Sequence, residues 1–230
     1  QSERLAAVGQ TVAQVVHEIK NPLMIIGGFS QQIRKHLTDQ KALQKLDMIS
    51  EEVARLDKLA RELTDFTKDY KLVQRAADIH SVLMDVLRIM SEIHPSDKYE
   101  FSVDFSPNVQ EVYCDPDKMK QVFINILSNS IEAMEEGGTI TISTERDSEG
   151  VEIRITDEGV GIEEGDLYHI FEPFYTTRER GSGLGLAISF KIVEAHGGEI
   201  SAYSLPGEGA TFVIRLPAQG APPHGTERGL

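Results

Sequence analysis

The sequence has little of several features that would mark particular classes of protein. Cys114 is the single cysteine among 230 residues, which excludes an internal disulfide and a zinc site built on cysteines. No run reaches the roughly 18 consecutive apolar residues of a membrane helix, and the N-terminus lacks the basic and then apolar pattern of a signal peptide. Basic residues are scarce as well: 23 Lys and Arg stand against 37 Asp and Glu, a formal net charge of −14. Because nucleic-acid binding rests on clustered basic side chains, no nucleic-acid partner is expected.

The negative charge is confined to one part of the chain. Residues 1–70 contain 10 basic and 10 acidic residues, which leaves 13 (23 − 10) basic and 27 (37 − 10) acidic residues for the rest. The hydrophobic pattern changes at the same point, and the two changes together predict a domain boundary near residues 70–78. We therefore expect one domain at 1–72, a second at 73–217, and a tail at 218–230 whose composition predicts disorder.

The first domain is predicted to be a helical hairpin. Apolar residues recur every three or four positions at Leu5, Val8, Val12, Val15, Ile19, Pro22, Ile26, Phe29 and Ile33, and again at Leu46, Ile49, Val53, Leu56, Ala60, Leu63, Thr67 and Tyr70. The charge-rich residues 36–45 are the expected turn, with Thr38 and Asp39 as a cap. The seam is widened by Val16, Leu23, Leu59 and Phe66.

A seam of this width needs more partners than one helix supplies. A four-helix bundle made by two chains satisfies that need most simply, and a single hairpin packed on the second domain is the alternative. Since the chain begins at Gln1 and its first residues already look helical, we expect it to be part of a longer protein.

The second domain is predicted to be α+β. Helices are expected at 78–94, 115–134 and 183–196, strands at 100–105, 139–145, 151–156, 199–204 and 211–216, and a short extended piece at 109–114. Phe101, Val103 and Phe105 alternate and are expected to point inward. The strands are expected to form a mixed sheet that carries the three helices on one face. The irregular segment 157–182 is long for a compact domain, and loops of that length are usually functional, often as a lid.

Four segments carry residues suited to chemistry, and the first contains His17. This histidine falls on the side of its helix that faces away from the seam, so we expect its ring to be in solvent. An ordinary surface histidine is the alternative, but Glu18 is adjacent, Asn21 lies one turn along, and Pro22 removes a helix hydrogen bond beside them. A neutral imidazole can attack phosphorus through one nitrogen when a carboxylate holds the proton on the other, and Glu18 can supply that carboxylate.

The second and third segments carry amides, a carboxylate and glycines. Asn125 and Asn129 share one face of a predicted helix, where they suit either a solvated surface or a Mg²⁺ site, because amide oxygens are hard ligands. Asp157 directly follows a predicted strand, where its carboxylate can accept a hydrogen bond from the exocyclic amine of adenine. Gly159 and Gly161 let the backbone approach a flat ring, although this pattern alone is more often a turn.

The fourth segment is rich in glycine and opens a predicted helix. It consists of Gly181, Ser182, Gly183, Leu184 and Gly185. The free N–H groups and the positive dipole end of such a helix suit a phosphate. The segment is not a dinucleotide fingerprint, because irregular chain and not a strand precedes it, and the sequence contains no P-loop motif.

The order and spacing of these segments closely resemble the motifs of the sensor histidine kinases. Residues 17–23 match that family's phosphoacceptor box, 125–129 its N box, 157–161 its first glycine box, 171–174 its F box and 181–186 its second glycine box. The resemblance covers about residues 1–217. It implies an α+β chain in which a helical hairpin forms a dimeric four-helix bundle, followed by an α/β-sandwich ATP-binding domain of the GHKL (Bergerat) type. The first box looks like the sporulation and nitrogen-regulation branch, which suggests a sporulation kinase.

The resemblance also implies which residues bind ATP and Mg²⁺. They are Asn125, Asn129, Asp157, Gly159, Gly161, Phe174, Thr177, Arg178, Gly181, Ser182, Gly183, Leu184 and Gly185. Asp157 would meet the adenine, Asn129 would bind Mg²⁺, and the glycine-rich amides would meet phosphate. Arg178 or Arg180 would help to neutralise charge during transfer.

In the same arrangement His17 would be the phosphoacceptor, Glu18 its base, and Asn21 the residue that orients water for dephosphorylation of the partner. The phosphoryl group would then pass to an aspartate of a response regulator docked on the bundle of a homodimer. Small protein inhibitors of the bundle are further expected partners. The location expected from the resemblance is the cytoplasmic portion of a kinase that is anchored in the membrane upstream.

The sequence departs from the family pattern at three positions. Ser130 and Glu132 stand where many relatives carry alanine and a basic residue, so no phosphate contact is expected from position 132. Arg178 stands where lysine is common.

Two rival functional classes remain. One is a GHKL-fold ATPase or anti-sigma-type serine kinase, which would lack the histidine box. The other is a dimeric scaffold that binds nucleotide without transferring phosphate.

Overall fold

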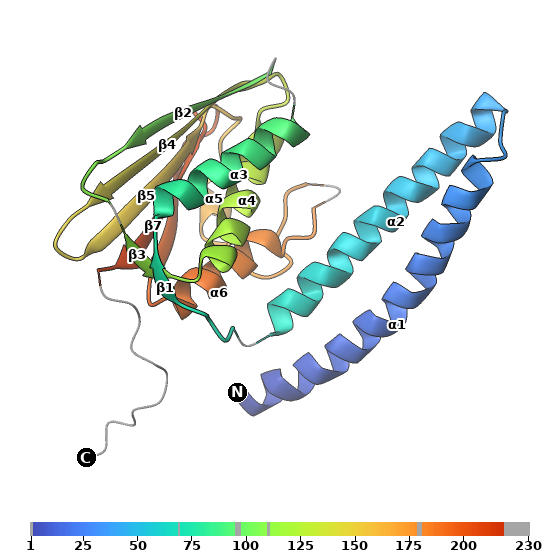
Figure 1. Ribbon diagram of the computed structural model, residues 1–230, viewed down its shortest axis with the longest axis horizontal. Coiled ribbons are helices and arrows are strands. Elements are labelled where there is room, and N and C mark those ends of the chain that lie inside the picture. The colour runs from blue at the N-terminus through green and yellow to red at the C-terminus, as the bar shows by residue number, and fades with distance from the viewer. Residues whose placement is uncertain (1, 69, 95–97, 110, 179–180, 219–230) are drawn as a thin grey trace. The chain divides into compact units, whose positions relative to one another are not determined.

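The computed structural model describes residues 2–68, 70–94, 98–109, 111–178 and 181–218, and within the first helix it describes the side chains of Val16 and of Glu18 onward. The chain divides into two compact units, Gln1–Asp69 and Tyr70–Leu230 (Figure 1). Apart from Ala218, the tail expected to be disordered lies outside the described residues.

The first unit is the predicted helical hairpin. Helix α1 spans Ser2–Arg34 and continues through Pro22, and helix α2 spans Gln40–Thr67. Asp39 caps α2 by accepting a hydrogen bond from the N–H of Lys41 at 3.2 Å. Because Asp39 caps the helix, α2 already begins at Gln40, and the turn is shorter than the predicted 36–45.

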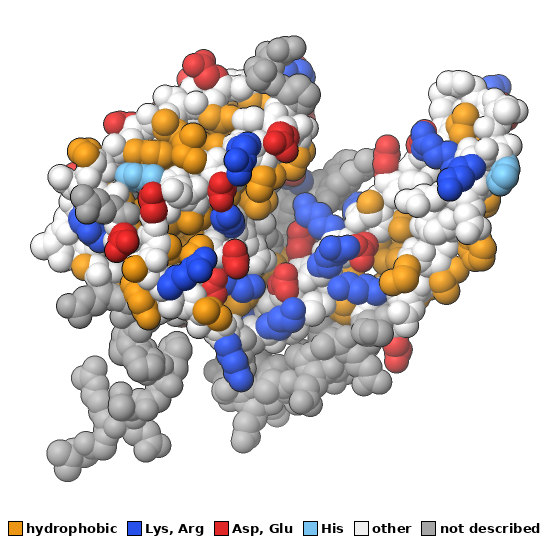
Figure 2. All heavy atoms as spheres, in the orientation of Figure 1, with side chains coloured by type: hydrophobic (Ala, Val, Ile, Leu, Met, Phe, Trp, Pro, Cys, Tyr) orange, Lys and Arg blue, Asp and Glu red, His pale blue; other side chains and the backbone are white. Residues whose placement is uncertain are grey.

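The two helices of the hairpin bury Val16 and Leu23, two of the four residues that widen the predicted seam, whereas Leu59 and Phe66 are half-buried. Val16, Leu23 and Ser30 of α1 are buried at seven-residue spacing, and α2 buries Leu46 and Ala60. The predicted seam residues of α1 remain exposed, with values of 43% for Ile19, 45% for Ile26, 57% for Phe29 and 49% for Ile33. Figure 2 shows apolar side chains gathered along this hairpin. Packing within one chain therefore leaves an apolar stripe for another surface.

The second unit is α+β, as predicted. Its sheet has the strand order β2-β4-β5-β7-β6, with β2 parallel to β4 and the other pairs antiparallel. The strands span Tyr99–Phe105 (β2), Gly138–Arg146 (β4), Gly150–Asp157 (β5), Glu199–Ser204 (β6) and Ala210–Pro217 (β7). Helices α3 (Ile79–Ile93), α4 (Pro116–Ala133) and α6 (Gly185–Ala195) lie on one face of this sheet (Figure 1). Strands β1 (Arg75–Ala77) and β3 (Val112–Cys114) form a separate antiparallel pair, and α5 (Glu164–Leu167) is a short helix.

The core of this unit lies between the sheet and its helices. It is built from Met119, Val122, Phe123, Ile126 and Leu127 of α4 and from Ile140, Ile142, Ile153, Ile155 and Ile214 of the strands, which are all fully buried. The helical residues recur at three and four positions and the strand residues at two, so each element turns one apolar face inward. Asp78 and Asp115 cap α3 and α4 through their carboxylates, which fixes where these helices begin.

Several details of the second unit differ from the prediction. Val103 was expected inward but is 45% exposed, because β2 is an edge strand with a neighbour on one side only. Strand β1 was not predicted, since three residues are too few to show alternation. Helix α5 interrupts the predicted irregular segment. Across the described residues, no helix is both long enough and apolar enough to cross a membrane.

Candidate functional site

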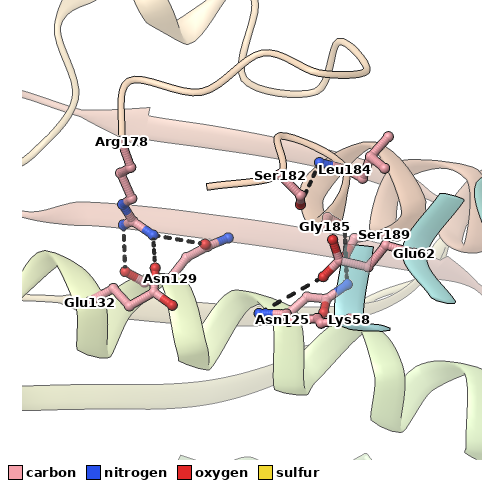
Figure 3. Close-up of polar contacts among 10 residues, drawn as sticks. All are labelled: Lys58, Glu62, Asn125, Asn129, Glu132, Arg178, Ser182, Leu184, Gly185 and Ser189. Atoms are coloured by element: carbon pink, nitrogen blue, oxygen red, sulfur yellow. Dashed lines mark hydrogen bonds and ion pairs between the residues drawn. The ribbon is translucent and has the colours of Figure 1, made fainter. Parts of the chain in front are cut away.

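The first part of the site is the polar face of α4 beside the start of α6. The amide nitrogen of Asn125 donates to the carbonyl oxygen of Gly185 at 3.0 Å and lies 3.3 Å from the hydroxyl of Ser189 (Figure 3). Asn125 thus connects α4 to the first turn of α6. Asn125, a predicted site residue, therefore lies at the glycine-rich segment, and its amide nitrogen is bonded to that segment.

One turn further along α4, Asn129 meets an arginine from the long segment between β5 and α6. Arg178 donates from Nη1 to the amide oxygen of Asn129 at 3.2 Å and from Nη2 to its main-chain oxygen at 3.0 Å (Figure 3). The same guanidinium forms an ion pair with Glu132, a residue expected to make no phosphate contact. Three oxygens of one helix turn therefore surround a cationic group.

The arrangement around Asn129 also tests the fit of the predicted Mg²⁺. The described part of the chain holds no cluster of three or more His, Cys, Asp or Glu side chains suited to a metal. The amide oxygen of Asn129 and the carboxylate of Glu132 nevertheless both face one cation. One or two hard oxygens from the protein suit a Mg²⁺ ion, which takes its remaining ligands from phosphates and water.

Asp157, at the end of β5, is the second part of the site. Its side chain is 3% exposed. One carboxylate oxygen accepts hydrogen bonds from the N–H groups of Gly159 at 3.0 Å and Ala210 at 3.1 Å, and the other accepts from the hydroxyl of Ser130 at 2.8 Å. These donors hold a buried carboxylate in one orientation.

Glycines after Asp157 are required by close backbone contacts. A Cβ at position 159 would lie 2.8 Å from the Cβ of Ala133. Gly161 has φ of +74°, and a Cβ there would lie 2.2 Å from the carbonyl oxygen of Leu205. The chain after Asp157 is thereby held between α4 and the turn from β6 to β7.

The glycine-rich segment before α6 is the third part of the site. Gly183 has φ of +66°, and its carbonyl accepts a hydrogen bond from the N–H of Phe174 at 2.9 Å. Phe174 itself has φ of +67° and is 62% exposed. The hydroxyl of Ser182 accepts from the N–H of Leu184 at 3.1 Å, and α6 begins at Gly185 with no side-chain cap among the described residues. The N–H groups of its first turn therefore suit an anion.

The segment that carries Arg178 is held at its base by a tyrosine. The hydroxyl of Tyr175 donates to Asp166 of α5 at 2.5 Å, and this bond raises the pKa of Tyr175 above its usual value. Gly181 lies against Thr176, since a Cβ at 181 would meet the Thr176 hydroxyl at 2.3 Å. Thr177 is exposed. Arg180, the alternative to Arg178, lies outside the described residues.

The phosphoacceptor box lies in the first unit. The backbone at His17 is helical, and the expected solvent exposure of its ring concerns a side chain outside the described ones. Glu18 and Asn21 are exposed on α1. The residues predicted to bind nucleotide all lie in the second unit.

Some residues of the site were not predicted as parts of it. Ser130 and Glu132 were noticed only as departures from a family pattern, yet they contact Asp157 and Arg178. Ser189 was missed because its neighbour Asn125 lies 64 positions away in the sequence. The position of Ser130 directly after Asn129 was the one available signal.

Two family models match the chain. The model described as the His Kinase A (phospho-acceptor) domain matches residues 7–69, and the model described as histidine kinase-, DNA gyrase B- and HSP90-like ATPase matches residues 114–220. Together they cover well over half of the chain, and they define its class as a phosphoacceptor hairpin followed by an ATPase-type domain.

Individual relatives agree with this class. Sporulation kinase E of Bacillus subtilis (strain 168) is 35% identical over 219 residues, which cover 95% of this chain and 30% of that protein. Sensor histidine kinase ZraS of Escherichia coli (strain K12) is 34% identical over 216 residues, 94% of this chain and 46% of that protein. The crystal structure of histidine kinase ThkA in complex with response regulator protein TrrA superposes with a TM-score of 0.71 at 32% identity, over 95% of this chain and 64% of that one.

The chain belongs to the sensor histidine kinases. It spans 30% and 46% of the lengths of the two relatives named above.

Proposed function

We propose that the chain is the kinase portion of a sensor histidine kinase, which phosphorylates itself on His17 from ATP and passes the phosphoryl group to an aspartate of a response regulator. In this proposal residues 1–72 form the dimerisation and phosphotransfer domain and residues 73–217 the catalytic domain. The observation that carries it is the buried, oriented carboxylate of Asp157 in the same unit as the N-terminus of α6, which no described side chain caps. The two suit the opposite ends of a nucleotide.

Each end of the nucleotide is assigned by its chemistry. Asp157 accepts a hydrogen bond from the adenine amine, and Gly159 and Gly161 allow the chain after it to pack closely against α4 and the turn from β6 to β7. The phosphates take the N–H groups at the start of α6, and Asn125 holds that start in place. Arg178 neutralises phosphate charge during transfer.

Mg²⁺ is part of the proposal through the oxygens that face Arg178. Asn129 would hold the ion together with the phosphates, and the ion would supply positive charge to them. The same oxygens face the Arg178 guanidinium, so they are arranged to meet positive charge, and the ion would take the place of the guanidinium at the Asn129 amide oxygen.

The chemical step is a transfer of the γ-phosphoryl group between two nucleophiles. One imidazole nitrogen of His17 attacks the γ-phosphorus, the bond from phosphorus to the bridging oxygen breaks, and ADP leaves. The proton on the other nitrogen is held by Glu18, which is adjacent and exposed. An aspartate carboxylate of the regulator then takes the phosphoryl group and the histidine is restored. Asn21 is assigned to orienting water when the phosphorylated regulator is hydrolysed.

The partners follow from the exposed faces of the hairpin. The apolar stripe of Ile19, Ile26, Phe29 and Ile33 suits the hairpin of a second chain, which would complete a four-helix bundle. The ThkA–TrrA complex supports a response regulator as the docking partner, and small protein inhibitors are proposed for the same bundle.

The similarity to sporulation kinase E supports a role in sporulation signalling. ZraS, a sensor histidine kinase, is nearly as similar to the chain. We assign the chain to the cytoplasmic side of a kinase anchored upstream.

The experiment that tests this function is incubation of the chain with γ-labelled ATP. A phosphohistidine gives label that is lost in acid and kept in alkali, and it disappears in His17→Gln. Acid-stable label would identify a serine kinase of the same fold. Release of labelled phosphate without label on the protein would identify an ATPase.

A further inference from the structure

Ser130 faces the carboxylate of Asp157 across the interior of the second unit. It follows Asn129 on α4 and is 1% exposed, and its hydroxyl donates to one carboxylate oxygen of Asp157 at 2.8 Å. The other oxygen accepts from two main-chain N–H groups, those of Gly159 and Ala210. The carboxylate is therefore held from both sides, and Ser130 is the side-chain donor.

Three other hydroxyls on helices of this chain use their proton differently. Ser50, Thr64 and Ser91 each donate to the carbonyl four residues earlier in their own helix, at 2.9, 2.8 and 2.9 Å. A hydroxyl has one proton to donate. Ser130 directs it away from its own helix to a strand 27 positions further along the sequence.

We propose that Ser130 is a positioning residue that fixes the acceptor face of Asp157 and so makes the site select a purine whose exocyclic amine is at C6. The proposal rests on the proposed function, in which Asp157 meets the adenine. A carboxylate oxygen can accept two hydrogen bonds, so an amine N–H can join the serine at the same oxygen. A carbonyl oxygen at that place, as in guanine, would meet an acceptor and be rejected. Without the hydroxyl the carboxylate loses one of its three donors and turns more freely.

The test compares dissociation constants of the full chain for ATP, GTP and purine riboside triphosphate, which lacks the amine. Ser130→Ala is expected to raise the constant for ATP about tenfold and to change that for purine riboside triphosphate about twofold or less. The preference for ATP over GTP falls accordingly. Ser91→Ala removes a helical hydroxyl that reaches no carboxylate and is expected to keep the preference of the unmodified chain.

Two further variants separate the outcomes. Asp157→Asn is expected to abolish the preference for the amine. If it does so while Ser130→Ala keeps the full preference, the role of Ser130 is overturned and the proposed function stands. If Asp157→Asn keeps the preference, adenine recognition by Asp157 is itself wrong. Ser130→Cys keeps the size of the side chain with a weaker donor, so its preference should lie between serine and alanine. If folded Ser130→Cys prefers ATP over GTP as strongly as the unmodified chain does, the proposal is also contradicted.

Discussion

Arg178 and Asn129 are joined by two hydrogen bonds, one from the guanidinium to the amide oxygen at 3.2 Å and one to the main-chain oxygen at 3.0 Å. The guanidinium also forms an ion pair with Glu132, three residues further along α4. The guanidinium presents its N–H groups in a rigid planar fork, which the ammonium of lysine lacks, so lysine is not an equivalent residue at position 178.

Replacing Arg178 by lysine is therefore expected to reduce kcat/KM for ATP about five- to twentyfold, since an ammonium keeps the charge but loses the fork. Steady-state autophosphorylation at several ATP concentrations measures this. Arg154→Lys, which changes an exposed arginine of β5 paired with Glu152, is the matched control. Equal effects of the two substitutions would show that the contacts of Arg178 do not matter.

Glu132→Gln is expected to have a smaller effect, about twofold or less in kcat/KM. The pair with Arg178 is partly exposed, with side-chain exposures of 52% for Glu132 and 38% for Arg178, and solvent screens such pairs. A loss as large as that of Arg178→Lys would mean that Glu132 has a direct role in the reaction.

Gly183→Ala is expected to destabilise the second unit by about 1–3 kcal/mol and to weaken ATP binding. The residue has φ of +66°, and an added Cβ would lie 2.4 Å from the carbonyl carbon of Phe174. Gly165→Ala is the control, because nothing lies within 4 Å of a Cβ at that position. Urea midpoints and nucleotide titrations measure both, and equal midpoints for the two variants would contradict the strain argument.

We expect the free energy of unfolding to decrease as the pH is lowered below about 6.5, and His196 is the cause. Its Nε2 accepts the N–H of Asp115 at 2.9 Å, so Nδ1 carries the proton and donates it to the carbonyl of Ile192 at 2.7 Å. Burial lowers the pKa of His196, and the main-chain bond and the Asp115 carboxylate oppose this only in part. As the pH falls through 6.5, the unfolded chain therefore takes up a proton that the folded chain does not.

The expected loss approaches about 1.4 kcal/mol per pH unit in this window and vanishes above it. Urea unfolding followed by circular dichroism between pH 5.5 and 7.5 measures the slope. His196→Gln should flatten it, whereas His94→Gln, at the end of α3, should not. An unchanged slope in His196→Gln would exclude this histidine as the source.

Introducing a charge on the apolar stripe of α1 is expected to separate the proposed dimer. Phe29→Asp puts a carboxylate at a position that is 57% exposed in one chain and apolar in the predicted seam. Gln31→Asp, on the opposite side of the same helix turn, is the control. Light scattering should give a monomer mass for Phe29→Asp and a dimer mass for the control and the unmodified chain. A monomer for all three would favour a hairpin that uses its stripe in some other way.

The elements and the caps were predictable because their signals are local. Asp39, Asp78 and Asp115 each stand next to the helix that they cap, and apolar spacing identified the long helices and the five strands of the sheet. The contacts that build the site are not local. Ser130 reaches Asp157 across 27 positions, Arg178 reaches Asn129 across 49, and His196 reaches Asp115 across 81.

The division of the seam also required the structure. Apolar spacing predicted one broad face on each helix but does not say which of its residues contact the partner helix of the same chain. In the hairpin Val16 and Leu23 are the buried residues of α1, whereas Ile26 and Phe29 are exposed. The −14 charge of the chain lies in the second unit, which in our proposal would hold a polyphosphate through the N–H groups at the start of α6 and Arg178.

The measurement that tests the central claim most directly is the location of the phosphoryl group after incubation with ATP, by mass spectrometry of peptides kept at neutral or alkaline pH. The unmodified chain should carry it on His17, and Asp157→Asn, with His17 intact, should carry little or none. A phosphoryl group on another residue, or on His17 at an unchanged level in Asp157→Asn, would contradict the account.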